Sequence, residues 1–192
     1  MRVVHHHQYT LEQYLIVEHD SQIKHEYFEG EIFAMTGGTP GHSALAMNIG
    51  VSLGSQLKGK PCQVYNADLR IGVQASGLYT YPDLSVVCGK SELDPVVPNT
   101  VVNPVVVVEV LSPSTEAYDR GQKFENYRRI PTLKEYVLAS QRERLVEVFR
   151  RGEKDEWLRT ETRGGRSARL ESIGCTLDVD EIYAGIQLQQ AG

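Results

Sequence analysis

The sequence predicts an α/β (α+β) fold in which helices flank a mixed β-sheet. The first indication is the segment 104–111, PVVVVEVL, which is so apolar that both of its faces must be covered, as in a central strand. The second is an amphipathic helix over residues 42–57, whose apolar side chains recur every fourth residue: Leu45, Ile49, Leu53 and Leu57. The third is the order of the predicted elements in the middle of the chain, which is helix, strand, strand, strand, helix, strand.

The N-terminal part of the chain predicts one helix and one hairpin before a glycine-rich loop. Residues 10–13, TLEQ, have the form of a capping box and predict a short helix to about Glu18. Residues 24–35 have the pattern of a hairpin around a Glu29-Gly30 turn. The loop over residues 36–41 lacks the GK[ST] ending of a phosphate-binding P-loop, so we exclude that kind of nucleotide site.

Three strands are predicted next, over residues 63–73, 80–88 and 104–111. A helix should run from about Glu116 to Arg129, where Pro131 stops it. The remaining elements are a strand over 135–140, a hairpin of 144–151 and 156–162, a short strand near Arg169 and a helical turn from Asp180. No internal repeat or low-complexity linker interrupts the chain. We therefore expect a single domain over residues 1–192 with a disordered tail at residues 1–9.

The net charge of −5 argues against strong indiscriminate binding to nucleic acid. The charge is uneven, however. Residues 120–169 carry 14 Lys and Arg against 8 Asp and Glu, whereas the rest of the chain carries 6 against 17. Two interpretations stay open: a basic face beside an acidic site, or ordinary solvated faces that carry charges of both signs.

Neither a membrane protein nor an exported protein is indicated. No apolar run approaches the roughly 20 residues of a membrane-spanning helix, and the N-terminus, MRVVHHHQYT, lacks the apolar centre of a signal peptide. Cys62, Cys88 and Cys175 are widely spaced and odd in number, so we expect unpaired thiols rather than a disulfide framework or a metal knuckle. A reducing cytoplasm suits such thiols.

Two carboxylates stand in strand-like, apolar surroundings. Asp83 lies in YTYPDLSVV and Glu109 in VVVVEVLS. Burying an ionised carboxylate is costly unless a cation compensates it. If the two strands are neighbours, both carboxylates converge on one point of the sheet, where a hard divalent cation such as Mg²⁺ would bind. The alternative is a structural ion pair or hydrogen bonding at the strand ends.

A lysine usually accompanies such carboxylates in phosphodiester chemistry, because it stabilises charge on the phosphate or holds the attacking water. The residue two positions after Glu109 is Leu111 and does not supply it. The following helix carries Lys123, and Asp119, Lys123 and Tyr127 lie four residues apart on one face. We therefore expect Lys123 to reach the carboxylates from that helix.

These motifs together resemble the Uma-type family of bacterial, notably cyanobacterial, proteins that are classed as endonucleases of the PD-(D/E)XK superfamily. The resemblance covers roughly residues 10–185. Its most specific element is the string EVLSPST with a lysine downstream, and the PD dipeptide is the least specific. The matching segments are HEY at 25–27, GEI at 30–32, MTGGT at 35–39, His42, YPD at 81–83, VEVLSPST at 108–115, Asp119, Lys123 and Tyr127.

The resemblance implies a restriction-endonuclease-like fold with an αβββαβ core, an added N-terminal hairpin and added C-terminal β-hairpins. It also implies Mg²⁺-dependent cleavage of DNA, for which Mn²⁺ would substitute. Asp83 and Glu109 would hold the metal, with Val110 supplying a carbonyl as a further ligand. Because Leu111 occupies the position of the usual EXK lysine, Lys123 would have to replace it.

Three further residues are candidates for the site, each with a plainer alternative. Glu26 would complete the acidic cluster or be a solvated strand glutamate. Tyr127 would donate a hydrogen bond at the site or only pack its ring against the sheet. His42 would contact a substrate phosphate or simply cap its helix.

The predicted function is metal-dependent hydrolysis of DNA by an endonuclease. A non-catalytic binding or assembly module on the same fold is the alternative, which the net negative charge favours. A homodimer is plausible for the nuclease, because two-fold pairing is the commonest oligomer and a duplex has two strands to cut.

Overall fold

A six-stranded mixed sheet forms the centre of the protein. The structure is a computed structural model and describes residues 8–35 and 37–189. The strand order is β11-β10-β9-β8-β6-β3, and only β8 and β9 are parallel. The strands are β3 (Cys62–Asn66), β6 (Leu84–Cys88), β8 (Val106–Val110), β9 (Glu135–Ala139), β10 (Leu145–Arg151) and β11 (Trp157–Arg163). This arrangement confirms the predicted α+β class.

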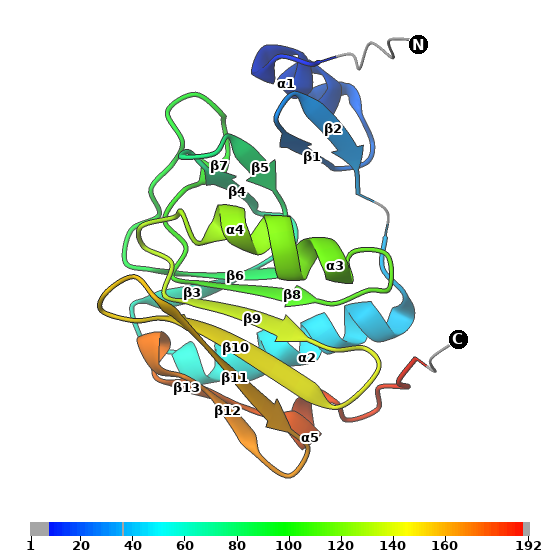
Figure 1. The fold of residues 1–192 in the computed structure, drawn as a ribbon, viewed down its shortest axis with the longest axis vertical. Helices are drawn as coiled ribbons and strands as arrows, with labels where there is room; N and C mark the ends of the chain where they lie inside the picture. The colour runs from blue at the N-terminus through cyan, green and yellow to red at the C-terminus, as the bar shows by residue number, and fades with distance from the viewer. Residues whose placement is uncertain (1–7, 36, 190–192) are drawn as a thin grey trace.

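Helices cover the two faces of this sheet, as Figure 1 shows. On one face lies α2 (Pro40–Leu57), which buries the predicted stripe Leu45, Ile49, Leu53 and Leu57. On the other lies a broken helix made of α3 (Glu116–Tyr118), the π-helical segment η1 (Asp119–Lys123) and α4 (Phe124–Tyr127). The valines of β8 alternate between these faces, so Glu109 points toward the broken helix.

A second sheet, in the order β2-β1-β5-β4-β7, carries the N-terminal part of the chain. Its strands are β1 (His25–Phe28), β2 (Glu31–Ala34), β4 (Arg70–Val73), β5 (Leu78–Thr80) and β7 (Thr100–Val101). The predicted capping box opens α1 (Leu11–Asp20), with both reciprocal hydrogen bonds of Thr10 and Gln13 present. The predicted hairpin turn is also confirmed, because Glu29 and Gly30 both have positive φ, at 49° and 84°.

The predicted strands over residues 63–73 and 80–88 are wrong as continuous elements. Each is divided between the two sheets, the first between β3 and β4 and the second between β5 and β6. Pro82 lies at the second break, where it cannot donate a hydrogen bond to a ladder. Asp83 therefore stands in the connection between the two sheets. The sequence had suggested that it lies within a strand.

The helix predicted from Glu116 to Arg129 is also not continuous. Gly121 has non-helical dihedrals, with φ −110° and ψ −105°, and these kink the helix within η1. Glycine tolerates such dihedrals because it has no Cβ.

The C-terminal segment packs beside α2. It comprises β12 (Ser167–Leu170), the 3₁₀ turn η2 (Glu171–Ile173), β13 (Cys175–Asp178) and α5 (Val179–Ile182). Together with the hairpin of β10 and β11, it matches the predicted C-terminal strands and helical turn. Among the described residues, no helix has the length and apolarity needed to cross a bilayer.

The structure corrects the prediction of three unpaired cysteines. Cys62 of β3 and Cys88 of β6 stand opposite each other in the antiparallel ladder and form a disulfide, while Cys175 is free and buried. Sequence spacing could not show this pairing, since the two strands become neighbours only in the folded sheet. The expectation of a reducing compartment, which relied on unpaired thiols, loses that support.

The predicted tail at residues 1–9 falls mostly on residues 1–7, which lie outside the described residues. Tyr9 is held against the N-terminal hairpin. Its N–H donates to the carbonyl of Gly30 (2.7 Å), and its own carbonyl accepts from the hydroxyl of Tyr27 (2.9 Å). At Tyr9, therefore, the prediction of disorder is wrong.

Candidate active site

Asp83 is anchored at the point where the chain enters the central sheet. Its Oδ2 accepts a hydrogen bond from the N–H of Val110 (2.7 Å), and its Oδ1 lies 2.8 Å from Nε2 of His42. Its own N–H points to Oε2 of Glu109 at 3.4 Å. The two carboxylates predicted to converge are thus neighbours, with Asp83 on the more exposed side.

Glu109 is the buried centre of the site. Its Oε1 accepts from the hydroxyl of Tyr127 (3.0 Å) and lies 2.8 Å from Nζ of Lys123. Burial raises the pKa of Glu109 to about 8, although the ammonium of Lys123 opposes the shift. The carboxylate is therefore under-compensated, which is the condition in which an additional cation would bind favourably.

Lys123 reaches the sheet from η1, as its place in the sequence predicted. Its Nζ also lies 3.6 Å from Oδ1 of Asp119, one turn earlier in η1. Burial alone would lower the pKa of Lys123, but the carboxylates of Glu109, Glu26 and Asp119 outweigh that effect and raise it. The lysine therefore stays charged at neutral pH, and its ammonium is the internal counter-ion of the site.

Glu26 belongs to the N-terminal hairpin but is buried beside the broken helix. Its Oε2 accepts from the hydroxyl of Thr80 (2.6 Å), and its Oε1 accepts from the hydroxyl of Tyr118. Its charge contributes to the raised pKa of Lys123. Glu26 is therefore not the solvated strand glutamate that the sequence left as its alternative.

His42 lies at the start of α2, where Thr39 is the helix N-cap. Both ring nitrogens have partners: Nε2 lies by Asp83, and Nδ1 lies 3.3 Å from Nε2 of Gln141. Burial lowers the pKa of His42, but the hydrogen bond and charge of Asp83 outweigh it and raise the pKa. In this structure the imidazole contacts a carboxylate of the site rather than standing free for a phosphate.

The donor set suits a hard divalent cation. Asp83 and Glu109 are in contact through the main-chain N–H of Asp83, and both offer carboxylate oxygens, the ligand type that Mg²⁺ prefers. Within the described part of the chain, no group of three His, Cys, Asp or Glu side chains is placed to hold a metal. The protein would therefore supply two carboxylates, and water or substrate would complete the coordination. The main-chain N–H of Val110 already orients Asp83.

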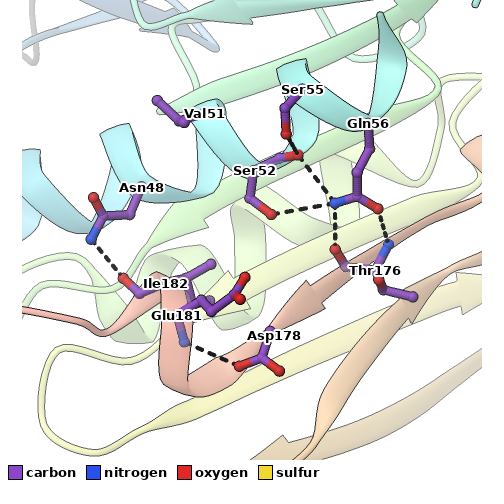
Figure 2. A pocket seen from close by; sticks show the side chains of 9 residues that line it. All are labelled: Asn48, Val51, Ser52, Ser55, Gln56, Thr176, Asp178, Glu181 and Ile182. Carbon is purple, nitrogen blue, oxygen red and sulfur yellow. Dashed lines mark hydrogen bonds between the residues drawn. The ribbon is translucent and has the colours of Figure 1, made fainter.

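A separate groove of about 500 Å³ lies between α2 and the C-terminal segment (Figure 2). It is lined mainly by polar side chains that bond to the main chain. The amide of Gln56 makes two hydrogen bonds with the backbone of Thr176 (2.7 and 2.9 Å), and Asn48 donates to the carbonyl of Ile182 (2.9 Å). These contacts fasten the C-terminal segment to α2, so the groove is structural.

Ion pairs neutralise much of the basic excess of residues 120–169. Eight of its arginines lie in ion pairs with carboxylates: Arg120, Arg128, Arg142, Arg144, Arg150, Arg151, Arg159 and Arg163. Of the two interpretations left open by the sequence, this pattern favours solvated faces that carry charges of both signs.

Comparison with known proteins identifies the family. The Uma2 family model, described as "Putative restriction endonuclease", matches residues 11–180. The chain belongs to the Uma2 family. Two relatives from Synechocystis are each named an uncharacterized protein: slr1290 is 38% identical over 175 residues, which is 91% of each chain, and sll1609 is 32% identical over 162 residues, which is 84% of this chain and 91% of the relative.

A solved structure shares the fold of this Uma2 chain. It is described as "a putative nuclease belonging to DUF820" from Anabaena variabilis. The two superpose with a TM-score of 0.76 at 18% identity, over 93% of this chain and 99% of the other. At this identity the similarity shows the fold alone, and it confirms the predicted nuclease-type architecture.

The structure adds residues to the site of this Uma2 chain that the sequence did not single out for it. Asp119 is buried beside Lys123, and burial raises its pKa. The four-residue spacing placed Asp119 on the correct face, but its burial could not be inferred. Gln141, which follows β9, had no local signal at all, because its partners come from three other parts of the chain.

Proposed function

We propose that this Uma2 protein is a metal-dependent endonuclease that hydrolyses phosphodiester bonds of DNA. The observation that supports the proposal most strongly is the pair of adjoining carboxylates, Asp83 and Glu109, with the ammonium of Lys123 buried against one of them. Two carboxylates and a lysine are the groups that this chemistry needs. The family assignment to restriction endonucleases supports the same conclusion.

The cofactor in this proposal is Mg²⁺, with Mn²⁺ as a substitute. Bound at Asp83 and Glu109, with Val110 contributing a carbonyl as a further ligand, it would polarise the phosphate and lower the pKa of a bound water. The protein's own groups orient and compensate the site. Lys123 places a positive charge at the buried carboxylate, where it would stabilise the transition state or hold the attacking water.

The remaining side chains hold these groups in place. The hydroxyl of Tyr127 donates to Glu109 and restricts its rotation. His42 and the N–H of Val110 bind the two oxygens of Asp83. Glu26 and Asp119 keep Lys123 charged. The protein would act on nucleic acid, as a homodimer if both strands of a duplex are cut.

Calorimetry with Mn²⁺ tests the metal site without any assumption about the substrate. We expect binding to wild type and loss of binding in Asp83→Asn and in Glu109→Gln. A matched control is Asp68→Asn, because Asp68 is an exposed aspartate that pairs with Lys24 away from the site. The same variants are then assayed for cleavage of DNA. If Asp83→Asn cleaves as fast as wild type, the activity belongs to another site or to a contaminant.

A second candidate is a binding or assembly module on the nuclease fold. It is favoured by one observation: both carboxylate oxygens of Asp83 and both of Glu109 already accept from protein donors. In that case wild type would bind DNA in a gel-shift assay while neither binding Mn²⁺ nor cleaving. Retention of DNA binding in Glu109→Gln does not separate the two functions, so cleavage is the deciding measurement.

A further inference from the structure

Gln141 is a buried amide at the junction of four segments. It lies between β9 and β10. Its Nε2 lies 2.8 Å from the carbonyl oxygen of Leu111 and 3.3 Å from Nδ1 of His42. Its Oε1 accepts from the hydroxyl of Thr39 (3.0 Å) and from Nε2 of Gln189 (3.0 Å).

The contacts determine which way the amide points. A carbonyl oxygen only accepts hydrogen bonds, so the group facing Leu111 must be the NH₂ of Gln141. The opposite end, which receives two donors, must then be the oxygen. An inverted amide would set its oxygen against the carbonyl of Leu111 and lose that bond.

The amide orientation restricts the proton position on His42 from one side of the ring, and the carboxylate of Asp83 restricts it from the other. The second N–H of Gln141 points to Nδ1 of His42, so Nδ1 must offer its lone pair. In a neutral imidazole the proton is then on Nε2, which donates to Oδ1 of Asp83 (2.8 Å). The ring also packs closely against Gly38, since a Cβ there would lie 2.8 Å from the imidazole.

We propose that Gln141 is a positioning residue that holds His42 as an Nε2–H donor directed at Asp83. With its only lone pair taken by Gln141, the neutral ring is not available as a general base. His42 instead orients the Asp83 carboxylate, in the way that outer groups orient ligands in metal sites. The importance of this orientation for hydrolysis rests on the proposed function, whereas the hydrogen-bond arrangement itself does not.

The test is ¹⁵N NMR of the histidine rings in the metal-free full chain, at an alkaline pH where the imidazole is neutral. His42→Asn identifies the signals of His42 among those of the six histidines. In wild type we expect an unprotonated, pyridine-type Nδ1 and a protonated, pyrrole-type Nε2. In Gln141→Glu, Nδ1 should become pyrrole-type, because a carboxylate at that position can only accept.

Two further variants are the controls. In Gln141→Leu, Nδ1 should keep less pyridine-type character than in wild type, because the amide donor is gone and only Asp83 still favours the proton on Nε2. In Gln56→Glu, the spectrum of His42 should not change, because Gln56 bonds to main chain in the groove of Figure 2 and not to His42. Thermal unfolding establishes that each variant is folded.

A protonated Nδ1 in wild type would overturn the proposal, as would a pyridine-type Nδ1 in folded Gln141→Glu. If Gln141→Glu does not fold, the proposal is tested on wild type alone. A scalar coupling between Nε2 of Gln141 and Nδ1 of His42 must then be observed, and its absence would overturn the proposal. These readouts need neither metal nor DNA. A negative result therefore leaves the nuclease proposal standing, and failed Mn²⁺ binding leaves this arrangement standing.

Discussion

Nζ of Lys123 lies 2.8 Å from Oε1 of Glu109, and each of the two side chains is less than a tenth exposed. This contact explains how a valine-rich central strand accommodates a glutamate. The ammonium comes from a helix that is folded back over the sheet, so it compensates part of the charge of Glu109 without either group reaching solvent. The same contact brings together two groups that phosphodiester hydrolysis requires.

Replacing Lys123 should leave buried carboxylates without their counter-ion. We expect Lys123→Met to lower the free energy of unfolding by about 3–5 kcal/mol at alkaline pH, above the pKa of about 8 of Glu109, which is the usual cost of breaking a buried pair from one side. Urea titration measures this change. The control is Lys134→Met, because Lys134 is exposed and should change stability by no more than about 0.5 kcal/mol. Equal stability of the two variants would mean that Glu109 is not ionised in the fold.

Glu147 should stabilise the protein only above the acid range. It is buried in β10, with Oε1 2.6 Å from Nε of Arg159 and Oε2 2.5 Å from Nη2 of Arg120 in η1. Burial raises the pKa of Glu147, but the hydrogen bonds and charges of the two arginines outweigh it and lower the pKa. The unfolded chain therefore binds this proton more readily, and stability falls as the pH drops below the ordinary glutamate value toward the folded pKa.

The variant Glu147→Gln should lose about 1–3 kcal/mol at neutral pH, a range reduced because Arg159 is half exposed. The stability of Glu147→Gln should also change less than that of wild type as the pH falls below the ordinary glutamate value. Urea titrations across that range measure both effects. Glu125→Gln is the matched control, since Glu125 is exposed and pairs with Arg128 at the surface. A Glu147→Gln curve parallel to that of wild type would contradict the assignment.

Two adjacent glycines should respond differently to alanine. A Cβ at Gly38 would lie 2.8 Å from the ring of His42, whereas a Cβ at Gly37 would meet nothing within 4 Å. Gly38→Ala should therefore displace the imidazole from Asp83 and cost about 1–3 kcal/mol, as overpacking does. Gly37→Ala should be neutral within about 0.5 kcal/mol. Thermal unfolding measures the loss of stability, and the NMR signals of His42 report the displacement of its ring. If both alanine variants behaved alike, Gly38 would not lie against His42.

The disulfide between β3 and β6 predicts a thiol count. Purified without reductant and then denatured, the protein should show one reactive thiol, from Cys175, and three after reduction. Cys88→Ser should lower the free energy of unfolding by about 2–4 kcal/mol, because the bridge joins residues 26 apart. Cys175→Ser, which removes the free thiol, is the control for the thiol count. Three thiols in the denatured, unreduced protein would contradict the bridge.

Local patterns in the sequence were sufficient for much of the fold. The four-residue stripe of α2, the capping box of α1 and the Glu29-Gly30 turn each form as predicted, because their signals lie within one element. Strand continuity was predicted less well. The runs 63–73 and 80–88 look continuous, yet each passes from one sheet to the other at a short break. Strand propensity does not report which sheet a residue joins.

For the site, the sequence identified the main residues, which are the carboxylates of Asp83 and Glu109 and the lysine on the next helix. It also showed the likeness to the Uma2 family. It identified the residues because burial of charge in an apolar run demands compensation, and few groups were near enough along the chain to supply it. Tertiary structure alone decided the rest. It brought Glu26, Gln141 and the Cys62–Cys88 bridge into place, since hydrogen bonds and covalent cross-links between distant segments depend on distances that no local pattern encodes.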